Sequence, residues 1–175
     1  MKKIFCFLMV VVLLLPGCAK KETEKITMEM VVQNFVDVYY GHEQPTKEKV
    51  RGLRHEVFWS SDFEETYQDY VEDWTENVAV LKEVFGEDYT YSVKIVSNAN
   101  DTQAREDMQK FLEKKHVSDV LVGVCALRLE ITFSGNGKTY VATGNVKAYI
   151  LSDWYIKDSV MESVNNMKNP KFFPQ

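Results

Sequence analysis

The chain after residue 26 begins with the apolar spacing of helices that bury one face. From Thr27 to Gly41, apolar residues recur every three or four positions, and a glycine commonly follows the last turn of a helix. A shorter pattern restarts at Pro45-Thr46 and is carried by Val50, Leu53 and Val57. These two patterns predict a pair of helices joined by a short connection.

The longest apolar pattern ends at Gly86 and covers about 24 residues, or about 36 Å of helix. Ser61 and Glu64 have the spacing of a capping box, in which two side chains satisfy free amides of the first turn. The sequence therefore predicts a long amphipathic helix. Its apolar positions are Phe63, Tyr67, Tyr70, Val71, Trp74, Val78, Leu81 and Phe85.

The second half of the chain changes to a period of two. Residues 89–96 alternate between apolar and polar, as a half-buried strand does. Residues 98–101 break this alternation and are expected to cap a helix over residues 102–115. A narrow apolar face indicates that this helix lies on the surface of a sheet. That face consists of Ala104, Met108, Phe111 and Leu112.

A long hairpin follows, with strands over residues 120–133 and 138–151 around the turn Ser134-Gly135-Asn136-Gly137. A second turn leads to a third strand over residues 154–157. From Asp158 we expect a short helix and then, over residues 161–175, the end of that helix and an irregular tail. Helices followed by antiparallel strands predict an α+β fold.

This order, ending in Trp154-Tyr155-Ile156-Lys157-Asp158, resembles the NTF2-like (cystatin-like) cone over residues 27–160. The resemblance implies N-terminal helices packed on a curved antiparallel sheet, as in small lipoproteins of that superfamily, many of unknown function. Enzymes on this cone use an acid and a tyrosine that face the cavity. Residues of suitable type in the predicted helices are Asp37, Tyr39, Tyr40, Tyr67, Tyr70 and Trp74.

The extreme N-terminus has the layout of a secretion signal. Two lysines precede the twelve uncharged residues 4–15, and small or kinked residues follow them. Twelve helical residues reach about 18 Å, too short for the hydrocarbon core of about 30 Å. Residues 1–17 are therefore expected to be a signal peptide rather than a membrane anchor.

The end of this segment, Leu15-Pro16-Gly17-Cys18, resembles the bacterial lipobox. The resemblance implies that Cys18 becomes the mature N-terminus and carries a diacylglyceryl group, with fatty acyl chains such as palmitate. Two acyl chains anchor a protein stably to a bilayer. We therefore expect a protein held at the extracytoplasmic face of the cell membrane, with residues 18–26 forming the lipidated cysteine and a charged linker.

Charge and cysteine content narrow the function further. Without the two lysines of the signal peptide, 19 basic residues face 26 acidic ones, which argues against a nucleic-acid partner. Cys6 leaves with the signal and Cys18 is the lipid site, so Cys125 remains and no intramolecular disulfide forms. Cys125 lies in an apolar run and is expected to pack in the core.

Motifs for cofactor chemistry are absent from the sequence. There is no H-E-x-x-H, no C-x-x-C and no G-x-S-x-G. Gly137-Lys138-Thr139 lacks the earlier glycine of a phosphate-binding loop and lies between strands rather than before a helix. We expect neither a metal site nor a cofactor.

Two functions are carried forward. The first is a lipid-anchored binding module for a small apolar ligand, a peptide or an envelope protein. The alternative is a cofactor-free acid–base enzyme of ketosteroid-isomerase or polyketide-cyclase type, with Asp37 as the base. A homodimer through the open face of the sheet is a further option, with Tyr140, Val146 and Tyr149 at the contact. The candidate pocket consists of Phe35, Tyr39, Tyr67, Tyr70 and Trp74.

Overall fold

The computed structural model describes residues 26–58, 62–117, 121, 123–151 and 153–169. The expected signal peptide, the lipobox with Cys18 and the charged linker up to Lys25 lie outside the described residues. No described helix is both long and apolar enough to cross a membrane.

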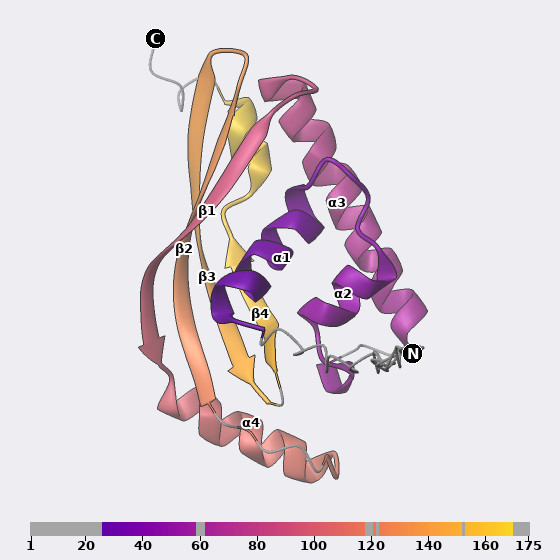
Figure 1. The fold of residues 1–175 in the computed structure, drawn as a ribbon, viewed down its shortest axis with the longest axis vertical. Coiled ribbons are helices and arrows are strands. Elements are labelled where there is room, and N and C mark those ends of the chain that lie inside the picture. The colour runs from indigo at the N-terminus through magenta and orange to yellow at the C-terminus, as the bar shows by residue number, and fades with distance from the viewer. Residues whose placement is uncertain (1–25, 59–61, 118–120, 122, 152, 170–175) are drawn as a thin grey trace, which may run out of the picture.

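The protein has an α+β fold in which helices cover one face of an antiparallel sheet (Figure 1). The strands are paired in the order β1-β2-β3-β4, so each strand lies beside its neighbour in the sequence. Along the chain the elements are α1 (Met28–Tyr40), α2 (Lys47–Leu53), η1 (Glu56–Phe58), α3 (Phe63–Phe85), β1 (Thr90–Asn100), α4 (Thr102–Lys114), β2 (Gly123–Gly135), β3 (Lys138–Ile150), β4 (Trp154–Met161) and η2 (Val164–Lys168).

The main core lies between the sheet and α1, with α3 packed on α1 from the outer side (Figure 1). Alternate residues of β2 face this core because successive side chains of a strand point to opposite faces. The helices contribute the residues at their apolar spacing, as the periodicity predicts. The fully buried side chains of this core include Phe35, Val36, Val38, Leu81, Phe85, Leu129, Ile131 and Phe133.

The start of α3 differs from the prediction by one residue. Asp62, not Ser61, is the N-cap, and its carboxylate accepts a hydrogen bond from the Glu65 backbone N–H at 2.8 Å. Asp62 and Glu65 have the same three-residue spacing as the predicted pair. Carboxylates at this position also interact favourably with the helix dipole.

The strand β1 continues beyond the predicted break at Asn98. Asn98 and Asn100 still pair with Leu127 and Cys125 of β2, after a register shift between Ile95 and Ser97. This bulge, which changes the side on which later residues point, disguises the strand in the sequence. The predicted cap of the next helix is confirmed, because Asp101 accepts from the Ala104 N–H at 2.9 Å.

The helix α4 crosses one end of the sheet and covers a second, smaller apolar cluster (Figure 1). Ala104, Met108 and Leu112 are its buried residues, three of the four predicted apolar positions. They pack in one cluster with Val124 and Tyr149, which are paired residues of neighbouring strands.

The C-terminal part differs most from the prediction. The expected helix from Asp158 is wrong: β4 runs on to Met161, past a register shift at Lys147/Ala148 of β3. The short helix η2 follows, and its residues Val164 and Met167 are buried in the main core. The chain therefore remains part of the domain up to η2.

The predicted dimer residues do not lie on the open face. Tyr140, Val146 and Tyr149 are only 6%, 1% and 3% exposed, because the first two face the main core and the third lies in the α4 cluster. The prediction for these residues is wrong.

Candidate functional site

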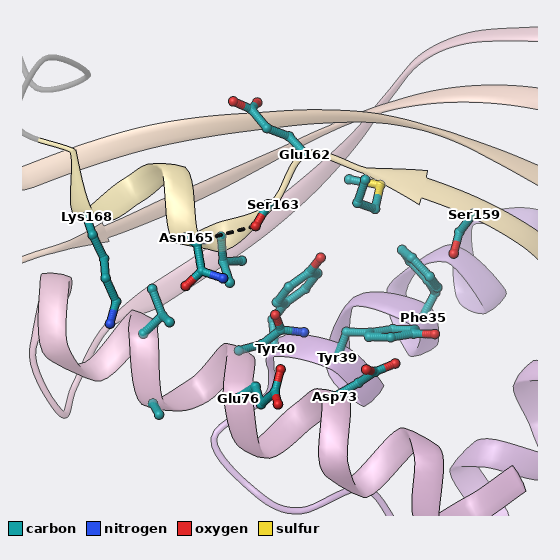
Figure 2. Close-up of a pocket in the computed structure, with 15 residues that line it drawn as sticks. Phe35, Tyr39, Tyr40, Asp73, Glu76, Ser159, Glu162, Ser163, Asn165 and Lys168 are labelled. Carbon is teal, nitrogen blue, oxygen red and sulfur yellow. Dashed lines mark hydrogen bonds between the residues drawn. The ribbon is translucent and has the colours of Figure 1, made fainter.

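A groove of about 610 Å³ lies between the helices and the end of the sheet (Figure 2). One wall comes from α1 and α3, and the other from the last residues of β4 and from η2. We call this hollow the groove. Its lining includes Phe35, Tyr39, Tyr40, Asp73, Glu76, Asn77, Val80, Ser159, Met161, Ser163, Val164, Asn165 and Lys168.

Helix geometry explains the first wall. Phe35 and Tyr39 are four residues apart on α1 and therefore lie on one side of it, with ring centroids 5.0 Å apart. On α3, Asp73, Asn77 and Val80 have spacings of four and three residues and also share one side. The first wall thus has an aromatic part, which comes from α1, and a polar part, which comes from α3.

The second wall depends on the late end of β4. Met161 pairs with Gly144 at the end of the strand, and η2 then returns towards α3. An ion pair of 2.5 Å between Lys168 and Glu83 attaches η2 to that helix. Lys168 is therefore neutralised within the protein, although it lines the groove.

Two smaller hollows adjoin the groove, of about 270 Å³ and 340 Å³. Tyr39 lines all three, so it stands where they meet. Tyr70 lies against it, with the rings edge to face at 5.4 Å. Burial, reinforced by Tyr70 and Asp73, raises the pKa of Tyr39 well above its usual value. The Tyr39 phenol is therefore neutral at physiological pH.

Tyr40 is the most unusual member of the groove. Its side chain is only 5% exposed, and its ring packs edge to face on Phe133 at 5.3 Å. Its hydroxyl points across the groove towards the residues after β4 (Figure 2). Burial, with a smaller effect of Asp73, raises its pKa to about 12. Within the part of the chain that the structure describes, this hydroxyl has no hydrogen-bond partner.

Negative charge gathers on the α3 wall. Asp73 and Glu76 line the groove, with Asp69 and Glu72 beside them on the same helix. Partial burial raises the pKa of Asp73, and repulsion from Glu76, Asp69 and Glu72 raises it further. Four carboxylates within about two turns make this wall unfavourable for an anion.

The structure brings together only part of the predicted pocket. Phe35, Tyr39 and Tyr70 meet as expected. Tyr67 and Trp74 do not line the groove, so the prediction for these two is wrong. Their polar atoms bind the connection after α1 instead: Tyr67 donates to the Pro45 carbonyl at 3.1 Å, and Trp74 donates to the Gly41 carbonyl at 2.8 Å.

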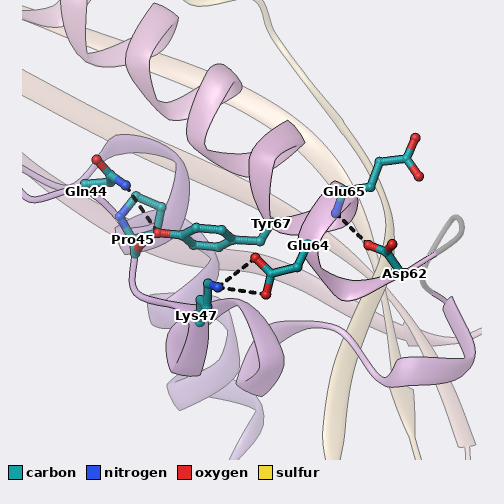
Figure 3. A network of polar contacts seen from close by, with 7 residues as sticks. All are labelled: Gln44, Pro45, Lys47, Asp62, Glu64, Glu65 and Tyr67. Carbon is teal, nitrogen blue, oxygen red and sulfur yellow. Dashed lines mark hydrogen bonds and ion pairs between the residues drawn. The ribbon is translucent and has the colours of Figure 1, made fainter.

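Tyr67 belongs to a polar network at the start of α3 (Figure 3). Its hydroxyl also accepts from the Gln44 amide at 3.2 Å. Beside it, Lys47 at the start of α2 forms an ion pair of 2.7 Å with Glu64. The network fixes the α1–α2 connection against α3.

Asp37, the predicted base, lies outside the groove. Its carboxylate accepts hydrogen bonds from the Tyr91 hydroxyl at 3.0 Å and from the Gln33 amide at 2.9 Å. Tyr91 belongs to β1, and Gln33 lies one turn earlier on α1. Asp37 is thus a structural acceptor, and it does not lie in the groove, where the acid–base alternative would need it.

Several groove residues were not predicted. Asp73 and Glu76 have the pattern of solvated positions at the edge of the long helix, so nothing in the sequence separates them from other surface acids. Ser163 and Asn165 were missed because the strand before them was expected to be a helix. The consecutive pair Tyr39-Tyr40 is the one signal that could have indicated the groove, since both rings are buried on one helix.

Among the described residues, no three His, Cys, Asp or Glu side chains are placed to hold a metal ion. Comparison of the chain with protein-family models and with solved structures finds no match.

Proposed function

We propose that the protein is a lipid-anchored binding module on the outer side of a cytoplasmic membrane, with the groove as its ligand site. The anchor is supported by the basic head, the uncharged segment over residues 4–15 and the sequence Leu15-Pro16-Gly17-Cys18. A diacylated Cys18 would hold the domain at the membrane without a spanning helix.

We further propose that the fold is an NTF2-like cone. The order of helices, crossing helix α4 and antiparallel meander supports this, as does the way the long strands bend past α1 (Figure 1). In such a cone the space between the long helix and the end of the sheet is the natural place for a ligand.

The observation that carries the binding function is the Tyr40 hydroxyl. A buried polar group normally has a hydrogen-bond partner, and a missing one indicates a site for a water molecule or a ligand. The groove also has the size of small-molecule sites, which span roughly 300–1,000 Å³. The aromatic and aliphatic side chains of the groove would contact the apolar part of a ligand, and the Tyr40 hydroxyl would fix the ligand's orientation.

The acid–base enzyme is the weaker proposal. Its base, Asp37, is committed to Tyr91 and Gln33 away from the groove. Asp73 has a raised pKa and stands near two tyrosines, which is the chemistry that such an enzyme needs. However, Asp73 is only partly desolvated and its side chain stays largely exposed, so it lacks the dry surroundings that make a carboxylate an effective base.

The anchor is tested by fractionation of cells that express the full chain. Cys18→Ser should move the protein from the membrane fraction to the soluble fraction and remove the lipid mass. Cys125→Ser is the matched control, because that thiol is buried in the core and should leave the protein at the membrane. Retention of Cys18→Ser in the membrane, with the mass of an unmodified chain, would contradict the anchor.

The groove is tested by native mass spectrometry of the full lipoprotein, released from detergent after purification from its own host. A ligand should appear as an added mass that disappears on denaturation. Asn77→Trp, which fills the groove from α3, should abolish that mass. Thr75→Trp adds the same ring on the exposed side of the same helix and should retain it. An unliganded mass at every charge state would contradict a tight small-molecule site.

A further inference from the structure

We propose that the ligand of the groove is an organic ammonium: a protonated amine carried on an apolar or aromatic body. This inference rests on the proposed binding function, because it names the ligand class for the same groove. Some polar groups of the groove have partners within the protein, and others have none among the described residues.

Charged residues at the groove fall into two groups. Glu162 accepts from the Tyr140 hydroxyl and from the Thr143 N–H, and its side chain points away from the groove (Figure 2). Lys168 is paired with Glu83. The carboxylate of Glu162 thus has donors in the protein, and the Lys168 ammonium has a counter-ion, so both have little to offer a ligand.

Asp73 and Glu76 form the second group. Within the described chain, neither carboxylate has a hydrogen-bond or ion-pair partner, and both line the groove from α3. Partial burial raises the pKa of Asp73, and repulsion from Glu76 and the neighbouring acids of α3 raises it further. A cation placed between them would relieve the repulsion, whereas an anion would increase it.

Tyr40 is an independent observation in the same groove. Its side chain is only 5% exposed, and its hydroxyl faces the groove and has no partner among the described residues. A phenol oxygen accepts a hydrogen bond from an ammonium as readily as it donates one to a neutral group. It therefore supplies the uncharged contact that a carboxylate pair alone would lack.

The aromatic rings add to the preference for a cation. Phe35, Tyr39 and Tyr40 line the groove from α1, on the same wall as the α3 carboxylates, and a cation over an aromatic face gains a further attraction. The apolar part of the ligand has Val80, Met161 and Val164 to contact. The wall chemistry thus matches both halves of an organic ammonium.

Three probes of one skeleton test the charge requirement: tyramine, tyrosol and 4-hydroxyphenylacetate, which end in an ammonium, a hydroxyl and a carboxylate. Binding to the full lipoprotein in detergent is measured by ligand-observed NMR. Tyramine should bind at least about tenfold more tightly than tyrosol, as expected for hydrogen bonds to charged groups, and 4-hydroxyphenylacetate should bind least.

Variants assign the effect to the groove. Glu76→Gln and Tyr40→Phe should each weaken tyramine binding about tenfold. Glu65→Gln is the matched control: it removes the same charge from an exposed position in the first turn of α3, about three turns from Glu76 and outside the groove lining, and should change binding less than about twofold. Thermal unfolding of each variant shows whether it remains folded, and Glu76→Gln, an exposed change, keeps the test valid if Tyr40→Phe does not.

A second arm distinguishes a free amine from a peptide N-terminus. The peptide Tyr-Gly-Gly is compared with its N-acetylated form, which keeps the ring and loses the charge. Binding of both tyramine and the free peptide, but not of the acetylated peptide, means that the groove binds an ammonium group on a small amine and at a peptide N-terminus alike. Binding of tyramine alone limits the site to small amines.

Equal affinities for tyramine and tyrosol would overturn the ammonium inference, as would an equal loss in Glu65→Gln and Glu76→Gln. So would the absence of binding by any probe. The binding function is judged separately by the native mass spectrum: a neutral or anionic mass retained in the wild type and lost in Asn77→Trp would keep the groove as a site and reject the amine.

Discussion

Two groups of aromatic side chains on the same face of the fold have opposite roles. Tyr89, Trp74 and Tyr67 donate to the backbone carbonyls of Tyr40, Gly41 and Pro45, at 2.7, 2.8 and 3.1 Å. Tyr40 instead directs its hydroxyl into the groove, and Tyr39, which packs against Tyr70, lines the same hollow. The first group closes the connection between α1 and α2, and in the second Tyr40 leaves a polar atom for a ligand.

The difference shows that burial alone does not identify a binding residue. All five side chains are buried or half-buried, four on the helices α1 and α3 and Tyr89 in the connection between α3 and β1. What separates them is whether the polar atom at the tip finds a partner in the protein. A tip that is bonded to a backbone carbonyl stabilises the fold, whereas an unbonded tip beside a hollow is available to a ligand.

The largest effect is expected for Tyr89→Phe. Its hydroxyl is buried with the Tyr40 carbonyl, and removing it leaves that carbonyl without this donor. The free energy of unfolding should fall by about 1–3 kcal/mol, measured by urea denaturation. A loss below about 0.5 kcal/mol would mean that the two groups of aromatics do not differ in the way described.

Trp74→Phe should have a smaller effect. The aromatic contact is largely kept and the bond from the indole N–H to the Gly41 carbonyl is lost. Because this bond is only half-buried, we expect a loss of about 0.5–1.5 kcal/mol in the same urea experiment. Unchanged stability would show that water replaces the indole at no cost.

A still smaller change in stability is expected for Tyr40 at alkaline pH, because Tyr40 is only one of nine tyrosines. A phenol is charged when deprotonated, and burial raises the pKa of Tyr40 from its usual value to about 12. Its contribution to stability is therefore complete below about pH 10 and is lost as the pH rises through about 12.

This pH effect is measured by urea unfolding at pH 9 and at pH 11.5. Tyr40→Phe, which cannot ionise, should lose less stability between the two values than the wild type does. An identical loss in both proteins would show that Tyr40 ionises at its ordinary pKa and is not shielded.

The smallest effect on stability is expected for Tyr40→Phe near neutral pH. The change removes a hydroxyl that has no partner among the described residues and keeps the ring on Phe133. Its free energy of unfolding should stay within about 0.5 kcal/mol of the wild type or increase slightly. A loss as large as that of Tyr89→Phe would place Tyr40 in the structural group.

Much of the fold was predictable because its helices and strands have clear periods. The helix caps and the hairpin turn depend on one or two residues each. Asp101 caps α4, and Asn136 and Gly137, which both have a positive φ, form the hairpin turn. The two main errors, at Asn98 and at Asp158, both follow a register shift within a strand. A shift breaks the alternation that sequence reading depends on.

The site was less predictable because α3 packs against both α1 and η2. At about 100° per residue, Tyr67 and Trp74 stand roughly 40–60° to one side of Tyr70, and Asp73 and Asn77 stand on its other side. The apolar period places all of them near the buried face. Only the packing of α3 against α1 and η2 decides which side borders the groove.

The close approach of Met161 to Gly144 has a consequence for the evolution of this protein. A Cβ at position 144 would collide with the Met161 sulfur and lie 2.8 Å from the Val160 carbonyl oxygen, so both a side chain and the backbone of β4 stand in the space that any larger residue needs. In homologous sequences, a residue other than glycine at position 144 should therefore occur together with a smaller residue at 161 and a displaced end of β4. Because Met161 lines the groove, such a change would also alter the shape of the ligand site.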